Sequence, residues 1–481
     1  MNRLLPIIIL LFVSFHSCNE LTNEVKPNFI VVFLDDMGYG DLGSYGHPTI
    51  KTPNLDKMAY EGQKWTQFYS ASSVCTPSRA ALLTGRLPIR NGMIGNEYRV
   101  LFPNSTYGLP DSEITIAEKL KDNGYETAAI GKWHLGHKKQ YLPLQNGFNY
   151  YYGIPYSNDM DRINGETCCP GSQYWQKYED ERPESTNYNV PLIENNEIIE
   201  RPADQTTITK RFSEKAVEFI KDNKENNFFI YLAHSLPHTP LYASDDFLGK
   251  SKRGLYGDVI EEIDYGMGRI IDELKKNDLD ENTIVIFTSD NGPWLPFESH
   301  SGSAGLLRNG KGTTWEGGQR VPGIFWGAGI KPAVIDGLGS TMDIFPTLLE
   351  MSNSTAIDDR IIDGVSLKNT LTKLEPSKRE KIFYYRSREI YAVRYGEFKA
   401  HYITQGVYNY PPGSNEKIIL EKPLLYNLNI DPSEKYNIAD NHPDVLAQID
   451  KIVEMHKKNL DPPEDLLKYR IFDENFVPDE N

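Results

Sequence analysis

The chain has 481 residues, enough for one large core with a smaller domain beside it. Apolar residues make up 39% of the sequence and charged residues 25%, as in soluble globular proteins. The formal net charge of −16 argues against nucleic acid and acidic membrane surfaces as nonspecific partners. Any anionic substrate must therefore be met by a local cluster of cations.

The N-terminus has the features of a secretory signal peptide, which we assign to residues 1–17. Arg3 is followed by an apolar run over residues 4–15 that is too short to span a bilayer comfortably. Cys18 follows in the position of a lipidated first residue of a mature lipoprotein, and residues 18–26 would be a tether. Simple cleavage without lipidation is the alternative. We expect an exported protein, periplasmic or held at the outer membrane through a lipid anchor alone.

The apolar run after Pro77 predicts a buried helix with Pro77 in its first turn, where the missing N–H of proline costs nothing. Cys75 would then lie at the helix N-terminus, where unpaired amides and the helix dipole favour negative charge. Such a position suits a reactive sulfur or an oxyanion. A buried structural cysteine is the alternative.

Four short apolar runs, rich in β-branched residues, alternate with helical stretches, which predicts an α/β fold with a largely parallel sheet. In chain order they cover residues 28–34, 126–130, 228–233 and 283–289. The polar residues that follow them are Asp35 and Asp36, Lys132 and His134, His238, and Asp290 and Asn291. Because ligands bind beyond the carboxyl ends of the strands in such sheets, we expect these side chains to form one site.

Three carboxylates and one amide in this set are hard oxygen donors, namely Asp35, Asp36, Asp290 and Asn291. They suit Ca²⁺ or Mg²⁺ rather than zinc, and no histidine-rich ligand spacing accompanies them. We expect one calcium ion, with magnesium as the alternative. Solvated turns are the competing explanation for acidic residues after strands.

A glycine-rich segment, residues 309–318, carries Lys311 between two glycines that permit close approach of the backbone to a ligand. A flexible loop with an incidental lysine is the alternative. Together, Arg79, Lys132 and Lys311 would supply the local positive charge that an anionic substrate needs in this acidic protein.

The pattern changes from about Ser377. Short antiparallel strands are predicted at residues 383–386, 391–394, 398–403 and 424–427, and a helix from Asp444 to about Lys458. We therefore divide the chain into a larger domain, residues 27–376, and a small C-terminal sheet domain with its tail, residues 377–481.

Six motifs resemble, in order and spacing, those of the type I sulfatases, and among them the arylsulfatase A group. They are Cys75-Thr-Pro-Ser-Arg79, Gly131-Lys-Trp-His-Leu-Gly136, Gly153-Ile-Pro-Tyr-Ser157, Asp290-Asn-Gly-Pro293, Gly310-Lys-Gly-Thr-Thr-Trp-Glu-Gly-Gly318 and Lys399-Ala-His401. The resemblance extends from about Asn28 to about Leu428. It implies an alkaline-phosphatase-like sandwich, in which helices flank a large mixed, mostly parallel sheet, with a smaller C-terminal antiparallel-sheet domain.

The resemblance also implies a chemistry for Cys75. A maturation enzyme would oxidise it to formylglycine, and one oxygen of the hydrated aldehyde would attack sulfur and touch the metal. Arg79 would hold this hydrate. The remaining metal ligands would be Asp35, Asp36, Asp290 and Asn291.

Further residues acquire roles from the same resemblance. The sulfate oxygens would be bound by Lys132, Ser157 and Lys311. His238 would protonate the departing sugar oxygen, and His134 would take a proton from the second hydroxyl to expel sulfate. His401 would reach the substrate, with a purely structural histidine as the alternative.

The predicted activity is hydrolysis of sulfate esters, with exo-acting removal of sulfate from oligosaccharides of a sulfated polysaccharide. The abundant tyrosines, as at residues 150–152, suit sugar rings, although ordinary core and rim positions explain most of them. Two alternatives stay open: a phosphonate or phosphate ester hydrolase of the same superfamily, and a glycan-binding protein in which Cys75 is never modified.

Overall fold

The computed structural model describes residues 26–161, 184–407 and 413–472. The expected signal peptide, Cys18 and nearly all of the tether lie outside these residues, so they stay predictions. In the described part, no helix combines the length and the apolar character needed to cross a bilayer.

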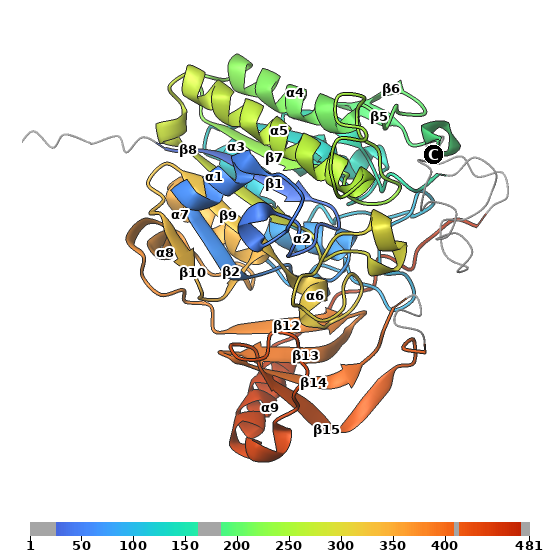
Figure 1. The fold of residues 1–481 in the computed structure, drawn as a ribbon, viewed down its shortest axis with the longest axis vertical. Helices are drawn as coiled ribbons and strands as arrows, with labels where there is room; N and C mark the ends of the chain where they lie inside the picture. Colours follow the sequence, from blue (N-terminus) through green and yellow to red (C-terminus); the bar gives the residue numbers. More distant parts are fainter. Residues whose placement is uncertain (1–25, 162–183, 408–412, 473–481) are drawn as a thin grey trace, which may run out of the picture.

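A large mixed sheet of 11 strands forms the centre of the bigger domain (Figure 1). Its order is β10-β2-β9-β8-β1-β7-β3-β4-β5-β6, and β11 pairs with β2. The strands are β1 Asn28–Leu34, β2 Gln63–Tyr69, β3 Glu126–Lys132, β4 Tyr150–Ile154, β5 Leu192–Glu194, β6 Glu197–Glu200, β7 Phe228–Ala233, β8 Thr283–Ser289, β9 Arg320–Gly327, β10 Ala333–Ile335 and β11 Gly339–Ser340.

The four strands predicted from sequence lie side by side as β8-β1-β7-β3, and all are parallel. Val31 of β1 stands between Ile286 of β8 and Tyr231 of β7. Strands covered on both faces read as continuous apolar runs, and all residues of β1, β7 and β8 are buried. Since the strands are parallel, their carboxyl ends meet at one edge of the sheet.

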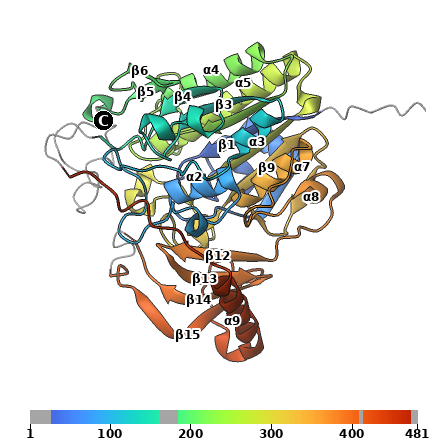
Figure 2. The same cartoon turned by 180° about the vertical axis from the view of Figure 1, so that it is seen from behind.

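Helices cover both faces of the sheet (Figures 1 and 2). One apolar core joins the sheet to α1 Pro53–Glu61, α4 Ile208–Asp222 and α5 Leu255–Lys276. A second core, on the opposite face, joins it to α2 Cys75–Thr84, α3 Ile116–Asp122, α7 Ile344–Met351 and α8 Lys368–Lys373. The short α6, Glu316–Gln319, leads directly into β9. This three-layer arrangement confirms the predicted α/β class.

A separate antiparallel sheet follows in the order β12-β13-β14-β15. Its strands are β12 Lys381–Arg386, β13 Glu389–Tyr395, β14 Phe398–Thr404 and β15 Ile418–Asn427, and α9 Pro443–Lys458 packs against it. The four predicted strands and the helix are thus present, with β15 beginning earlier than expected. The chain then returns to the larger domain, where Arg470 bridges to Ser105.

Candidate active site

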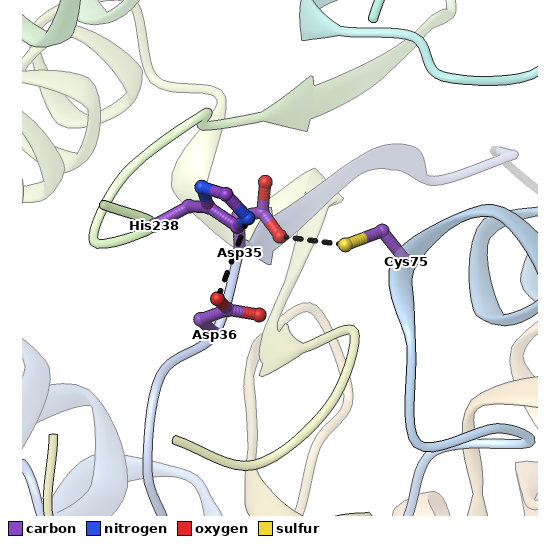
Figure 3. Close-up of side chains that lie close together, drawn as sticks. All are labelled: Asp35, Asp36, Cys75 and His238. Carbon is purple, nitrogen blue, oxygen red and sulfur yellow. Dashed lines mark hydrogen bonds and ion pairs between the residues drawn. The ribbon is translucent and has the colours of Figure 1, made fainter. Parts of the chain in front are cut away.

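The edge of the sheet where β1, β3 and β8 end carries a buried polar cluster. Asp35 and Asp36 follow β1, Lys132 ends β3, and Asp290 follows β8. The helix α2 brings Cys75 to the same place, and Figure 3 shows its sulfur directed at Asp35. All five residues are at most 2% exposed. The structure therefore brings together residues that lie far apart in the sequence.

Cys75 is the first residue of α2 and so lies at the helix N-terminus, as predicted, with Pro77 in the first turn. Its Sγ lies 3.3 Å from Oδ1 of Asp35. Burial raises the pKa of the Cys75 thiol well above its usual value, and the charge of Asp35 adds to this effect. The unmodified side chain is therefore a neutral thiol, which is a weak nucleophile despite its place at a helix N-terminus.

Arg79 lies one turn later on α2 and fixes Asp290. Its Nε and Nη2 donate to Oδ2 of Asp290 at 3.1 and 2.9 Å, and its Nη1 donates to the carbonyl of Lys132 at 2.8 Å. The forked guanidinium thus links α2, β3 and β8. Two donors on one carboxylate oxygen, both charge-assisted, give geometric precision as well as attraction.

The pKa values of the two aspartates after β1 are shifted in opposite directions. Burial opposes the charge of Asp35, yet Lys132, which forms an ion pair with it, and the neighbouring His238 and Arg79 hold its pKa well below the usual value. For Asp36, burial raises the pKa to about 6, although Lys311 favours its charged form. Asp36 also has a φ of 64°, a left-handed conformation that aspartate tolerates better than most residues.

Asp290 and Asn291 adjoin Asp36. The backbone N–H of Asp36 donates to Oδ1 of Asp290 at 3.2 Å, and Nδ2 of Asn291 donates to Oδ1 of Asp36 at 2.7 Å. Burial and the charge of Asp35 raise the pKa of Asp290 to about 7. Oδ1 of Asn291 is buried and has no hydrogen-bond partner among the described residues.

These residues fit a divalent cation. One ligand atom from each of Asp35, Asp36, Cys75 and His238 lies within 4.8 Å of the others. Crowded, buried carboxylates with raised pKa values are relieved by a cation, and the unsatisfied amide oxygen of Asn291 adds a further hard donor. The donor set suits Ca²⁺ or Mg²⁺.

Donors for an anion surround the cluster. Nζ of Lys132 donates to Oγ of Ser157 at 3.0 Å, and Nζ of Lys311 lies 2.7 Å from a carboxylate oxygen of Asp36. Trp294 packs beneath Lys311, with Nζ 4.3 Å from the ring centroid. The expected sulfate-binding residues Lys132, Ser157 and Lys311 are thus all present at one site.

His238 reaches the cluster from the loop after β7. Its Nδ1 lies 2.6 Å from the carbonyl oxygen of Thr239, an acceptor, so Nδ1 carries a proton. Its Nε2 faces the cluster, 3.6 Å from Oδ2 of Asp36 and 3.4 Å from Oγ of Ser157. Burial and the charge of Lys311 lower the pKa of His238 well below its usual value.

His134 follows β3 and is joined through its backbone to Thr76, the residue after Cys75. Its Nε2 lies 2.8 Å from the carbonyl of Leu101, and its own carbonyl accepts the hydroxyl of Thr76 at 3.0 Å. Nδ1 is buried without a partner in the ranges that the structure describes. With a proton on Nε2, Nδ1 presents a lone pair and can accept a proton.

His401 lies outside this cluster. It is fully buried in β14, its Nε2 is 2.7 Å from Oε1 of Glu434, and its ring stacks on Trp315 at 4.2 Å. Substrate contact by this residue stays a prediction, and its packing is compatible with the structural alternative.

Some residues of the site escaped sequence reasoning. Asn158 accepts from Nδ1 of His238 through Oδ1, 3.1 Å away, and Trp294 packs on His238 at 5.2 Å. Gly131 has a φ of 112°, and a Cβ there would lie 1.9 Å from the carbonyl oxygen of Ala233. Only Gly131 could have been suspected, because it directly precedes Lys132 within a quoted motif.

The fold and the site together define a hydrolase of the alkaline-phosphatase-like class, with a nucleophile position beside a cluster of metal-binding carboxylates. The chain belongs to the sulfatase family: the Sulfatase profile matches residues 27–354, and the profile for the C-terminal region of aryl-sulfatase matches residues 377–478. The protein is therefore a sulfuric ester hydrolase.

The relatives with known functions that resemble this chain are also sulfatases. Human (Homo sapiens) arylsulfatase A is 39% identical over 90% of this chain and 88% of its own length. Human N-acetylgalactosamine-6-sulfatase is 38% identical over 91% of this chain and 86% of its own length. The predicted likeness to arylsulfatase A is confirmed.

Solved structures extend the comparison. PsFucS1 sulfatase from Pseudoalteromonas sp. is 28% identical with a TM-score of 0.80, covering 91% of this chain and 92% of that one. Ps i-CgsB in complex with k-i-k-neocarrahexaose is 30% identical with a TM-score of 0.74, covering 92% and 94%. The phosphonate monoester hydrolase SpPMH from Silicibacter pomeroyi shares the fold at 17% identity and a TM-score of 0.62, covering 91% and 96%.

Proposed function

We propose that this sulfatase removes sulfate from sugar residues of oligosaccharides, using a formylglycine made from Cys75. The observation that carries the proposal is the place of Cys75, 3.3 Å from Asp35 and inside a buried cluster that also holds Lys132, Lys311 and Arg79. These cations can hold a sulfate group against the nucleophile. They supply the local positive charge that an anionic substrate needs in a protein whose net charge is −16.

Maturation of Cys75 is an oxidation by two electrons, in which the Cβ–S bond is replaced by a carbonyl whose oxygen comes from water, and sulfur leaves as hydrogen sulfide. We propose a maturation enzyme that passes the two electrons to an external acceptor, either dioxygen or a redox cofactor of that enzyme. The hydrated aldehyde supplies one hydroxyl that attacks sulfur and a second whose deprotonation releases sulfate without attack of water on sulfur. A divalent cation at the carboxylates supplies positive charge beside the reacting oxygens.

The protein's own residues would perform the remaining steps. Lys132, Ser157 and Lys311 donate to the sulfate oxygens and stabilise charge that develops there. His238 would act in its doubly protonated form: Nδ1 keeps its proton on the carbonyl of Thr239, and Nε2 gives a second proton to the departing sugar oxygen, since an alkoxide is a poor leaving group. The lowered pKa of His238 makes this form a strong acid. His134 accepts a proton at Nδ1 from the second hydroxyl, and Arg79 orients the hydrate.

A pocket beside the cluster supports an oligosaccharide substrate. It has a volume of about 650 Å³ and is bordered by Leu295, Arg308 and Trp315 from the larger domain and by the end of β14. Leu295 follows Trp294, which packs on both His238 and Lys311, so the pocket adjoins the site. The guanidinium of Arg308 lies 3.6 Å from the centroid of the Trp315 ring, and this pairing of aromatic face with cation suits a sulfated sugar.

The similarity to Ps i-CgsB, which was solved with an oligosaccharide, and to an N-acetylgalactosamine-6-sulfatase also supports a sugar substrate. We propose exo action because the catalytic cluster is buried, and the end of a chain enters a buried site more readily than its middle.

A phosphonate or phosphate ester hydrolase is the second candidate, because SpPMH has the same fold. Parallel turnover of an aryl sulfate and an aryl phosphonate separates the two. We expect the sulfate to be hydrolysed faster, and faster phosphonate turnover would reverse the assignment.

Mass analysis tests the nucleophile. Trypsin releases residues 65–79 as one peptide containing Cys75, and conversion of thiol to aldehyde lowers its mass. We expect the aldehyde in active protein and no turnover in Cys75→Ala. Turnover by Cys75→Ala would refute the covalent scheme, and a pure thiol peptide in inactive protein would favour a glycan-binding role.

We also propose export and lipid anchoring through Cys18. Fractionation of cells that express the full chain tests this. We expect the wild type with membranes and Cys18→Ala in the soluble exported fraction, and equal partitioning of the two would contradict anchoring.

A further inference from the structure

The loop that carries Lys311 is clamped at both ends by one residue of the C-terminal domain. We call residues 308–316 the lysine loop. At its start, Nη1 of Arg308 donates to the backbone carbonyl of Glu434 at 2.9 Å. At its end, the backbone N–H of Glu316 donates to Oε2 of Glu434 at 2.7 Å. Glu434 follows β15, so the smaller domain holds a loop of the larger one.

The side chain of Glu316 forms a second anchor. Its fully buried carboxylate accepts from Nζ of Lys399 at 3.0 Å, from the hydroxyl of Tyr384 at 2.8 Å and from the hydroxyl of Tyr69 at 2.6 Å. The first two donors belong to the C-terminal sheet. Burial opposes ionisation of Glu316, yet Lys399 and Arg320 hold its pKa at about 2, so the carboxylate is charged at neutral pH.

Glu434 is itself tightly held. Its carboxylate lies 3.0 Å from Nζ of Lys399 and 2.7 Å from Nε2 of His401, and it is fully buried. Its φ is 51°, a strained value for a residue that is neither glycine nor asparagine. Such strain persists where the surroundings fix a residue, and it is concentrated at functional sites. Lys399 therefore joins two buried carboxylates across the domain boundary.

We propose that Glu316, Lys399 and Glu434 form a positioning group for Lys311, so that the C-terminal domain determines where this lysine meets the sulfate group. Lys311 lies five residues before Glu316, and its Nζ is 2.7 Å from Asp36 in the catalytic cluster. Packed apolar side chains would stabilise a domain boundary as well as a buried ion network does. We therefore infer that the network serves to fix the position of the lysine loop rather than to add stability. This inference rests on the proposed function, because it takes Lys311 as a sulfate ligand.

Glu316→Gln and Glu434→Gln test the inference, since each keeps the shape of the side chain and leaves Lys399 one carboxylate. We expect kcat/KM for an aryl sulfate to fall about 10- to 100-fold, as a small misplacement of a binding group causes, and the inhibition constant of inorganic sulfate to rise. In a Lys311→Ala background the same substitutions should cause no further loss, because the group being positioned is gone.

The matched control is Glu113→Gln. Glu113 is also a buried glutamate in an ion pair, with Arg86 at 2.7 Å, but it lies away from the lysine loop. We expect this variant to lose stability while its kcat/KM and its inhibition by sulfate stay at wild-type values. Lys399→Arg, which keeps the charge and changes its geometry, serves if the glutamine variants fail to fold, and we expect an intermediate rise in the sulfate inhibition constant.

Several results would overturn the inference: wild-type inhibition by sulfate in folded Glu316→Gln, Glu434→Gln or Lys399→Arg, or losses that multiply in full with Lys311→Ala. A wild-type protein that carries the aldehyde at residue 75 but hydrolyses neither an aryl sulfate nor a sulfated oligosaccharide would instead refute the proposed function, so the two failures are distinguishable.

Discussion

The assignment of His238 as the proton donor predicts a dependence on the leaving group. Nδ1 of His238 is anchored to the carbonyl of Thr239 at 2.6 Å, and Nε2 faces the cluster 3.4 Å from Ser157. When the ring is doubly protonated, Nε2 carries the transferable proton, and His238→Ala removes this donor while Lys132 and Lys311 keep their anchors on the aspartates. A positioned acid contributes about 10²–10⁴-fold to rate, which corresponds to about 3–5 kcal/mol of transition-state stabilisation.

That stabilisation matters for a sugar alkoxide and hardly at all for a nitrophenolate, which leaves without a proton. We expect His238→Ala to lose about 10²–10⁴-fold in kcat on a sugar sulfate and less than about 10-fold on nitrophenyl sulfate. His234→Ala is the control: this buried histidine precedes His238 on the same segment, so its removal should leave the ratio between the two substrates unchanged. Equal losses of His238→Ala on both substrates would refute the assignment.

Three further predictions concern stability and the metal. Gly131→Ala places a Cβ 1.9 Å from the carbonyl oxygen of Ala233 at positive φ, so we expect the free energy of unfolding in urea to fall by about 2–5 kcal/mol. Gly124→Ala is the control: its φ is 84° but the space around it is open, so it should lose about 1–2 kcal/mol, and equal losses would contradict the steric argument. Chelation should lower both Tm and activity, and Ca²⁺ should restore them in the wild type but not in Asp36→Asn, because an ion that binds only the native state stabilises it. Glu316 has a pKa of about 2 in the folded protein, below its ordinary 4.5, so its ionisation should add on the order of 3 kcal/mol to the free energy of unfolding. This contribution should be complete above pH 4.5 and be lost as the pH falls toward 2. The free energy of unfolding of Glu316→Gln should therefore depend less on pH in this range, and an unchanged dependence would show that this carboxylate is not the group that titrates.

The four central strands could be predicted because each is buried on both faces. The run Asn28–Leu34 is apolar from its second residue onward and is followed directly by aspartates, so both its type and its end are visible in the sequence. The same change from apolar to polar residues at the end of residues 283–289 predicted the positions of Asp290 and Asn291. The start of β15 was missed because its first half, residues 418–423, has three apolar residues followed by two charged ones and a proline, and it is largely exposed.

Contacts between distant residues could not be predicted. Glu316 meets Lys399 across 83 positions and Glu434 across 118, and no local pattern indicates such pairing. The start of α2 at Cys75, by contrast, could be predicted, because Pro77 marks the first turn of that helix. The pairing of Glu316 with Lys399 and Glu434 arises from the packing of one domain on the other.

The pairing of charges in the catalytic cluster affects how the protein meets its substrate. Asp35, Asp36 and Asp290 are set against three basic side chains, Arg79, Lys132 and Lys311, so the protein part of the centre is close to neutral and a divalent ion makes it positive. The surrounding molecule carries −16. A polyanionic glycan would thus be repelled at long range and attracted within the last few ångströms, so moderate salt, by screening the outer field, should speed its capture more than that of a singly charged aryl ester.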